Sequence, residues 1–217
     1  VGDSNNYITR FEFASTGSAV DHADLTFTSK NGGSYSNATR AIQHRGYGAP
    51  SITHRNVDAF EMASTANAFD FGDIVSSAQY GGGGLASPTR GIIHIAYDGS
   101  TTNTIEFCTI STSGSFTDFG DATTTLNNVR SGTGGSSTRG VSMGGGDSYT
   151  DVCSFLTIAT TGNTTNFGDL STGKSYSNAV SDRITCMMAG GQLAPGGTIT
   201  NQIDSLSIAT GGTAVDS

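Results

Sequence analysis

The sequence predicts an all-β protein built from a repeat of about 48 residues, and three observations support this prediction. The triplet Phe-Gly-Asp recurs at Phe71, Phe119 and Phe167, with equal steps between the copies (119 − 71 = 48 and 167 − 119 = 48). Short segments alternate apolar and polar residues with the period of two that is typical of strands. The 217 residues include 31 Gly and many Ser and Thr, and this composition favours short strands and tight turns.

One strand type returns five times along the chain. The copies are residues 7–14, 57–62, 104–110, 152–158 and 203–208. Each copy precedes a turn rich in Ser, Thr, Gly and Asn, and the Phe-Gly-Asp element follows that turn. Residues 20–24 are a degenerate copy of this element, and residues 215–217 are a shortened one. Glycine after the phenylalanine permits a positive φ angle, and the aspartate beside it can bond its own backbone there.

Two further strands complete each repeat. The first is rich in small residues, and it includes identical pentapeptides at residues 34–38 and 175–179, which we expect at equivalent positions. The second opens with an arginine and runs into apolar residues and a glycine cluster. These arginines are Arg40, Arg90, Arg139 and Arg183. Each repeat therefore holds four short strands and leaves no room for a helix.

We expect a single repeat domain over residues 1–217. It divides into a half repeat at 1–26, full repeats at 27–75, 76–123 and 124–171, and a last, truncated repeat at 172–217. Four antiparallel strands in 40–50 residues are typical of one blade of a β-propeller. The aromatic strand occurs five times but the arginine-led strand only four times, and the chain begins in mid-repeat, as a processed or partial chain does. Two arrangements stay open: five blades with one split or incomplete, or an open array whose subunits complete each other.

The repeats resemble the kelch-like repeats, with an Asn-Ala-Thr-Asp-Phe-Gly-Asp-Leu signature, of virion and tail-associated proteins of bacteriophages, notably cyanophages. Residues 163–170 (Asn-Thr-Thr-Asn-Phe-Gly-Asp-Leu) and 137–141 (Ser-Thr-Arg-Gly-Val) carry the resemblance, which covers nearly the whole chain. The tryptophan usual in the last kelch strand is absent, and phenylalanine takes its place. The resemblance implies a kelch-like β-propeller of about four to five four-stranded blades, including an incomplete one.

The recurrent charged residues are expected to be structural. The four arginines can pair with an aspartate of their own or the neighbouring Phe-Gly-Asp turn and so hold the blades together, and we expect Arg90, Arg139 and Arg183 to contact carboxylates or backbone carbonyls at the blade junctions. The alternative is a ring of cations that binds an anionic ligand. The recurrent aspartates, Asp73, Asp121 and Asp169, are expected to cap turns, together with Asp70, Asp118 and Asn166. Calcium binding is the alternative, since hard cations take several oxygen ligands.

The sequence offers no motif for a catalytic, cofactor or metal site. His44 and His94 share one position of the repeat, which Met143 and Met187 take in the other copies, and a soft metal site is the alternative to a core position. The three cysteines do not share a position, and we expect small core hydrophobes: Cys108 matches Phe60 and Leu156, Cys153 matches Val57 and Ile105, and Cys186 matches Ile93. Asn37 and Asn163 fit the glycosylation pattern but are expected to be plain turn residues.

The net charge of −8 argues against nucleic acid as a partner, because an acidic surface repels phosphate. No apolar run approaches the roughly 18 residues that a membrane-spanning helix needs. We therefore expect a non-enzymatic structural or adhesive protein, located in a virion or outside the cell. The resemblance implies a tail fibre, knob or capsid decoration, whose partners are other virion or fibre subunits in an oligomer and host-surface glycans. The alternatives are a secreted bacterial carbohydrate-binding or fibre-forming protein and, third, an enzyme on a propeller scaffold.

Overall fold

The computed structural model describes residues 5–14, 16–46, 54–78, 80–97, 100–126, 132–146, 149–193 and 197–216. These residues form 21 strands and no helix. Neighbouring strands pair in antiparallel fashion, as tight turns between consecutive strands require. The prediction of an all-β chain made of four-stranded units is thus confirmed.

Four sheets of four strands follow one another along the chain, and we call them blades 1 to 4. Blade 1 contains β3 (Ser34–Ser36), β4 (Arg40–His44), β5 (His54–Glu61) and β6 (Phe69–Ala78). Blade 2 contains β7 (Tyr80–Ala86), β8 (Arg90–Tyr97), β9 (Thr102–Thr109) and β10 (Thr117–Leu126). Blade 3 contains β11 (Gly132–Gly135), β12 (Arg139–Gly145), β13 (Thr150–Thr157) and β14 (Thr165–Asp169). Blade 4 contains β16 (Asn178–Ser181), β17 (Thr185–Ala189), β20 (Ile203–Ser207) and β21 (Val215–Asp216).

Two smaller sheets accompany the blades. β1 (Asn5–Arg10) and β2 (Val20–Ser29) form a two-stranded sheet that we call the half-sheet. β15 (Lys174–Ser175), β18 (Gln192–Leu193) and β19 (Thr198–Ile199) form a small three-stranded sheet beside blade 4. The half-sheet matches the two outer strands of a blade, because β1 pairs with β2 as β9 pairs with β10.

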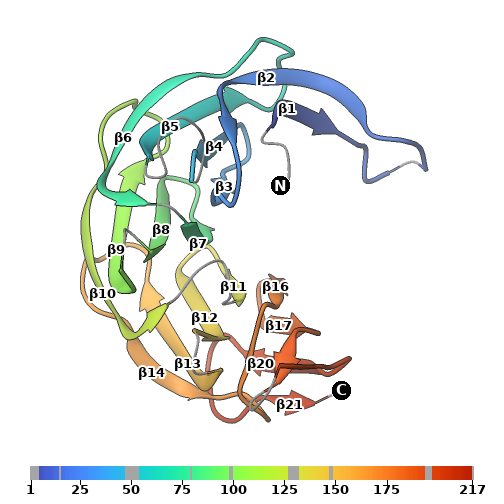
Figure 1. Ribbon diagram of the computed structural model, residues 1–217, viewed down its shortest axis with the longest axis vertical. Coiled ribbons are helices and arrows are strands. Elements are labelled where there is room, and N and C mark those ends of the chain that lie inside the picture. The colour runs from blue at the N-terminus through green and yellow to red at the C-terminus, as the bar shows by residue number, and fades with distance from the viewer. Residues whose placement is uncertain are drawn as a thin grey trace.

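The blades lie side by side in an open arc (Figure 1). The first strands of the blades, β3, β7, β11 and β16, line the inner side of the arc, while β6, β10 and β14 run along its outer side. The half-sheet occupies one end of the arc and blade 4 the other, so that the N- and C-terminal parts lie across the opening from each other. The architecture is therefore propeller-like, without a closed ring.

The hydrophobic core lies between successive blades. Three clusters of buried side chains correspond to the three junctions between blades 1 and 2, 2 and 3, and 3 and 4. At the first junction, Val57 and Phe71 of blade 1 pack with Cys108 and Ile110 of blade 2. The same positions recur at the next two junctions as Ile105 and Phe119 with Leu156 and Ile158, and as Cys153 and Phe167 with Leu206 and Ile208. Both faces of an inner blade are thus covered by apolar contacts.

The expected register is wrong in the last repeat. Arg40, Arg90 and Arg139 pair with Glu61, Thr109 and Thr157, whereas Thr185 pairs with the matching Ser207. Thr185 therefore takes the arginine position, and Arg183 lies in the bend before β17. In this register, Ala189 and not Met187 takes the position of His44 and His94. Cys186 likewise does not take the position of Ile93.

The two identical pentapeptides are not equivalent either. Tyr35 lies in β3, is buried and pairs with Ile42. Tyr176 lies between β15 and β16, has a φ angle of +58° and is exposed. Val180, which pairs with Met187, takes the position of Tyr35 instead. A shared five-residue sequence thus adopts two conformations, because the flanking strands decide the pairing.

Candidate functional site

Three arginines join each blade to the next through the backbone. Each guanidinium donates a hydrogen bond from Nη1 to the carbonyl oxygen at the end of the third strand of the following blade. The bonds are 3.0 Å from Arg40 to Ile110, 2.9 Å from Arg90 to Ile158 and 2.7 Å from Arg139 to Ile208. A charged donor makes each of these bonds stronger than a bond between neutral groups. The three arginines therefore form one repeated inter-blade contact.

Aromatic rings hold these guanidinium groups in place. Arg90 lies over the ring of Phe107 at 4.4 Å from its centroid, and Arg139 lies over Phe155 at 4.6 Å. Arg40 also forms an ion pair of 2.6 Å with Glu61. The expected contact of Arg90 and Arg139 with backbone carbonyls at the blade junctions is therefore confirmed. Aromatic rings and Glu61 are the other partners of these arginines, in place of the aspartates of the Phe-Gly-Asp turns.

Arg183 does not take part in this arrangement. Its side chain is exposed and makes none of these contacts with the described residues. The Oδ1 atom of Asp182 accepts hydrogen bonds from the N–H groups of Ile184 and Thr185, as Asn37 does from Thr39 and Arg40. Asp182 is thus the cap of this turn, and Arg183 is one residue after it instead of three. The expected contact of Arg183 at a blade junction is wrong for this reason.

The Phe-Gly-Asp element is a bulge that touches the following blade. The register shifts by one residue at Phe71, at Phe119 and at Phe167, which marks a β-bulge in β6, β10 and β14. Gly72 has a φ angle of +145°, and a Cβ atom there would lie 2.5 Å from the carbonyl oxygen of Gly114 in the next blade. Glycine is therefore required both for the backbone angle and for the close approach.

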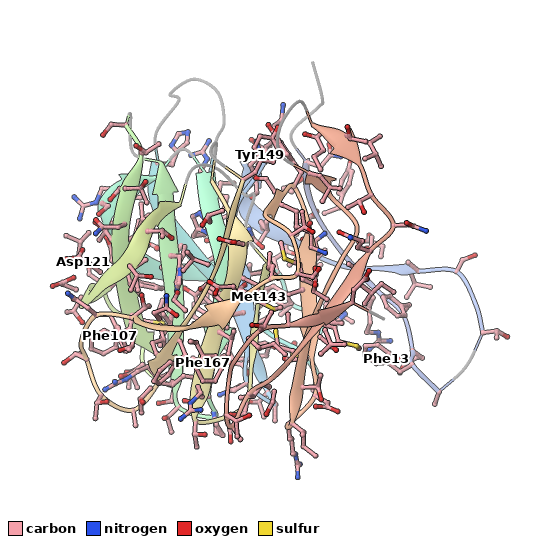
Figure 2. The ribbon with its side chains drawn as sticks, turned by 90° about the horizontal axis from the view of Figure 1, so that it is seen from below. Phe13, Phe107, Asp121, Met143, Tyr149 and Phe167 are labelled. Carbon is pink, nitrogen blue, oxygen red and sulfur yellow. The ribbon has the colours of Figure 1, made fainter. Side chains whose placement is uncertain are left out.

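Backbone hydrogen bonds follow from this approach. The carbonyls of Phe71 and Asp73 accept bonds of 2.8 Å from the N–H groups of Gly114 and Phe116. The pattern repeats from blade 2 to blade 3 and from blade 3 to blade 4, and the carbonyls of Asp121 and Asp169 accept from Thr164 and Ala214. The side chains of Asp73, Asp121 and Asp169 are exposed, and Figure 2 shows Asp121 at the outer side of the molecule. The backbone of these residues makes the inter-blade contact.

The neighbouring polar residues close the turns. The side chains of Asp70, Asp118 and Asn166 accept hydrogen bonds from the N–H groups of Gly72, Gly120 and Gly168 at 3.0–3.2 Å. Both asparagines of the glycosylation pattern bridge two blades as well. Asn37 donates to the carbonyl of Pro88, and Asn163 accepts from the N–H group of Asp121. These amides therefore act as turn and junction residues in the folded chain.

A second repeated contact was missed in the sequence analysis. Asp58, Glu106 and Asp204 share one buried position in the third strand of blades 1, 2 and 4. Each carboxylate accepts hydrogen bonds from the last strand of the preceding sheet or from the residues just after that strand. Asp58 accepts from the N–H and hydroxyl of Thr26 at 2.6 and 2.8 Å, Glu106 from the N–H groups of Val75 and Ser76 at 2.7 and 2.8 Å, and Asp204 from the N–H of Ser171 at 3.2 Å. An acidic residue inside an otherwise apolar strand was the available signal.

Asp204 also forms a buried ion pair. The Nζ atom of Lys174 lies 2.7 Å from Oδ2 of Asp204, and both side chains are fully buried. Lys174 Nζ further donates to the carbonyls of Met188 and Gln202 at 3.4 Å. Burial raises the pKa of Asp204, but the hydrogen bonds from Lys174 and Ser171 outweigh it and hold the pKa below its usual range. The pair fastens the small sheet of β15, β18 and β19 to blade 4.

The two histidines that suggested a metal site are neutral core residues. Burial lowers the pKa of His44 and of His94 to about 4, and the contact of His44 with the backbone of Gly33 offsets this in part. His44 Nδ1 accepts a bond of 2.6 Å from the N–H of Gly33. Within the described part of the chain, no three residues of the types His, Cys, Asp or Glu gather to hold a metal ion.

The three cysteines are buried free thiols, and burial raises the pKa of Cys108 and Cys153 to about 12 and that of Cys186 to about 11. A thiol that stays protonated is a poor nucleophile and a poor ligand, so their position in the inter-blade clusters is a packing role.

A central cavity of about 800 Å³ opens where the inner strands of the four blades meet. Its lining includes Ser36, Ser87, Thr133, Ser181 and Arg183. The hydroxyl of Ser87 already accepts bonds from its own turn, at the N–H groups of Thr89 and Arg90. The cavity therefore offers hydroxyl groups together with the guanidinium of Arg183 and the carboxylate of Asp182.

No family model and no curated protein matches the chain. Among the described residues, none belongs to a helix long and apolar enough to cross a membrane.

Proposed function

We propose that this chain is a kelch-like β-propeller protein of a bacteriophage particle. It acts there as a non-enzymatic structural or adhesive component, such as a tail fibre, a knob or a capsid decoration. Its location is the virion or the extracellular space, and its partners are other virion or fibre subunits. The resemblance of the Phe-Gly-Asp repeats suggests this class of protein, and the four consecutive four-stranded blades support the propeller part of the proposal.

One structural observation carries the proposal: the recurrent polar residues are used between the blades. Arg90 holds the carbonyl of Ile158, and Glu106 holds the backbone of Val75 and Ser76. Catalysis instead needs groups of tuned acidity that converge on a cleft. A protein whose repeated charged residues join one repeat to the next is suited to a structural role and to binding other proteins in an assembly.

An image of the native particle tests this function. We expect the chain within a phage particle, burying at least about 1,000 Å² against neighbouring subunits. A free monomer that turns over a small substrate in its central cavity would contradict the proposal and favour an enzyme.

The central cavity favours a second candidate, a secreted carbohydrate-binding protein. Its hydroxyl groups and the exposed Arg183 suit a polyhydroxylated ligand, and its volume of about 800 Å³ is within the range of ligand sites. A glycan array separates the two candidates. Binding that is lost in an Arg183→Ala variant supports the carbohydrate-binding role, whereas a purely structural component gives no signal on the array.

A further inference from the structure

The two ends of the arc expose the two halves of the contact that joins the blades internally. Each internal junction has a leading face on the earlier blade and a trailing face on the later one. The leading face includes one apolar residue from the second strand and one from the third, such as Ile92 and Ile105 of blade 2. The trailing face presents two residues near the end of the third strand, such as Leu156 and Ile158 of blade 3.

Blade 4 presents an uncovered leading face. Met187 lies at the position of Ile42, Ile92 and Val141, and Ile203 lies at the position of Val57, Ile105 and Cys153. The six residues of blades 1 to 3 are fully buried, with 0% exposure, whereas Met187 and Ile203 are 40% and 39% exposed. Val180, at the position of buried Tyr35, is 63% exposed. The side chains are apolar as at the internal junctions, and within the described chain nothing covers them.

The half-sheet presents an uncovered trailing face. The register of β1 against β2 aligns Arg10 with Phe107, so that Phe11 and Phe13 correspond to Cys108 and Ile110. Cys108 and Ile110 are buried at the junction of blades 1 and 2, whereas Phe11 and Phe13 are 61% and 96% exposed and touch each other edge to face at 5.3 Å. Figure 2 shows Phe13 on the N-terminal segment that projects to one side of the sheets.

We propose that these two faces bind each other between copies of this chain, with blade 4 of one copy against the half-sheet of the next. The proposal rests on the structural role proposed above and names the partner as a second copy. Because the chain repeats the same junction three times between its own blades, the exposed leading and trailing faces match by position and by apolar character. The contact is heterologous, so it extends into a ring or a filament.

The opposite ends of one chain do not meet in this structure. Figure 1 shows the half-sheet and blade 4 separated across the opening of the arc. The core clusters, the arginine contacts and the buried carboxylates fix the angle at the junctions between them. A second copy reaches the exposed faces without changing these angles.

The joint between copies differs from the internal junctions in one respect. Thr185 of blade 4 takes the position of Arg40, Arg90 and Arg139, so the guanidinium contact to the next carbonyl is missing. The joint therefore depends on apolar contacts and is weaker than the internal junctions, so assembly should depend on protein concentration.

Sedimentation velocity of the full chain and of two face variants tests the joint. Ile203→Glu places a charge on the leading face, and a Phe11→Ser, Phe13→Ser double variant removes the trailing face. We expect the unaltered chain to form oligomers that grow with concentration, and each variant alone to stay monomeric. An equimolar mixture of the two variants should form dimers and nothing larger, since one intact face of each kind is left. Should Ile203→Glu fold poorly, Val180→Glu tests the same face.

Ile199→Glu, at an exposed isoleucine of β19 outside both faces, is the matched control and should assemble like the unaltered chain. A monomeric unaltered chain at every concentration overturns the joint, as does a single variant that still assembles. A chain that assembles in this way but is absent from phage particles retains the joint and refutes the virion function. A chain that is found in phage particles but stays monomeric when purified supports the virion function and refutes the joint.

Discussion

The guanidinium of Arg90 donates a hydrogen bond of 2.9 Å to the carbonyl oxygen of Ile158, which lies 68 residues further along the chain and in the next blade. This contact recurs from Arg40 to Ile110 and from Arg139 to Ile208. It links the second strand of one blade to the end of the third strand of the following one. The repeated arginine therefore connects one blade to the next. Its removal should lower the stability of the folded chain, whether or not the chain binds a ligand.

We expect Arg139→Ala to lower the free energy of unfolding by about 1–3 kcal/mol, because the carbonyls of Ile208 and Ala209 lose their charged donor. The stacking on Phe155 is lost as well. Chemical denaturation followed by circular dichroism measures the change. Arg183→Ala is the matched control, and this exposed residue should change stability by less than about 0.5 kcal/mol. Equal effects of the two substitutions would contradict the inter-blade role.

The glycine of the Phe-Gly-Asp element permits a second comparison. Gly120 and Gly162 have φ angles of +142° and +153°, so alanine is strained at both. A Cβ atom on Gly120 would also lie 2.6 Å from the carbonyl oxygen of Gly162, whereas a Cβ atom on Gly162 would meet open space. We expect Gly162→Ala to cost about 1–3 kcal/mol from the backbone angle alone. Gly120→Ala should cost about 1–3 kcal/mol more because of the steric contact. Thermal denaturation of both variants checks this. A similar loss of stability in the two variants would mean that the outer strand shifts to make room for the added methyl group and that the close approach is not required.

The buried carboxylate of Glu106 supports the chain where it passes from blade 1 to blade 2. In Glu106→Ala, the N–H groups of Val75 and Ser76 lose their acceptor, and we expect a loss of about 1–3 kcal/mol. Hydrogen exchange should show faster exchange of these two amides. Glu12→Ala, at an exposed glutamate, is the control and should leave both rates unchanged. Unaltered protection of Val75 and Ser76 in the Glu106 variant would show that other groups hold this segment.

The repeat and its strand content were predictable from the sequence, because turns impose local chemical requirements. Gly72, Gly120 and Gly168 each need a positive φ angle, and Asp70, Asp118 and Asn166 each close the same turn. Because the same turn needs the same residue types in each repeat, these residues recur at a regular spacing in the sequence. Packing positions such as Ile105 and Cys153 follow from the same spacing, since hydrophobic alternation at a fixed period marks equivalent strand positions.

The partners of the charged residues were not predictable to the same degree. A sequence shows that Arg139 recurs, but the carbonyl of Ile208 has no side-chain signature. In the last repeat, Asp182-Arg183 resembles the Thr-Arg pair of earlier repeats, although the cap at Asp182 shifts the strand start to Thr185. The sequence also left two arrangements open, an incomplete ring and an open array, because curvature depends on the packing at the junctions.

The exposed edges were foreseen only in part. Unequal numbers of strand copies predict incomplete pairing at the first and last repeats, and the half-sheet matches two strands of a blade. Which apolar side chains are uncovered requires the register, since Phe13 is aligned with Ile110 only through the pairing of β1 and β2. Residue types alone cannot separate an exposed phenylalanine from a buried one.

The buried histidines should make stability depend on pH below neutrality. Burial lowers the pKa of His44 and His94 to about 4, whereas an unfolded chain has a histidine pKa of about 6.5. Each histidine takes up a proton on unfolding in this interval, so stability is fully present above pH 6.5 and is lost as the pH falls toward 4. We expect a slope of about 1.4 kcal/mol per pH unit for each histidine. Met143 fills the same position in blade 3, so His44→Met and His94→Met remove the charge with a side chain that the fold already accepts. The double variant should flatten the dependence measured by denaturation between pH 4 and 6.5, whereas His54→Gln, at a partly exposed histidine, should retain it. An unchanged slope in the double variant would assign the acid sensitivity to other groups.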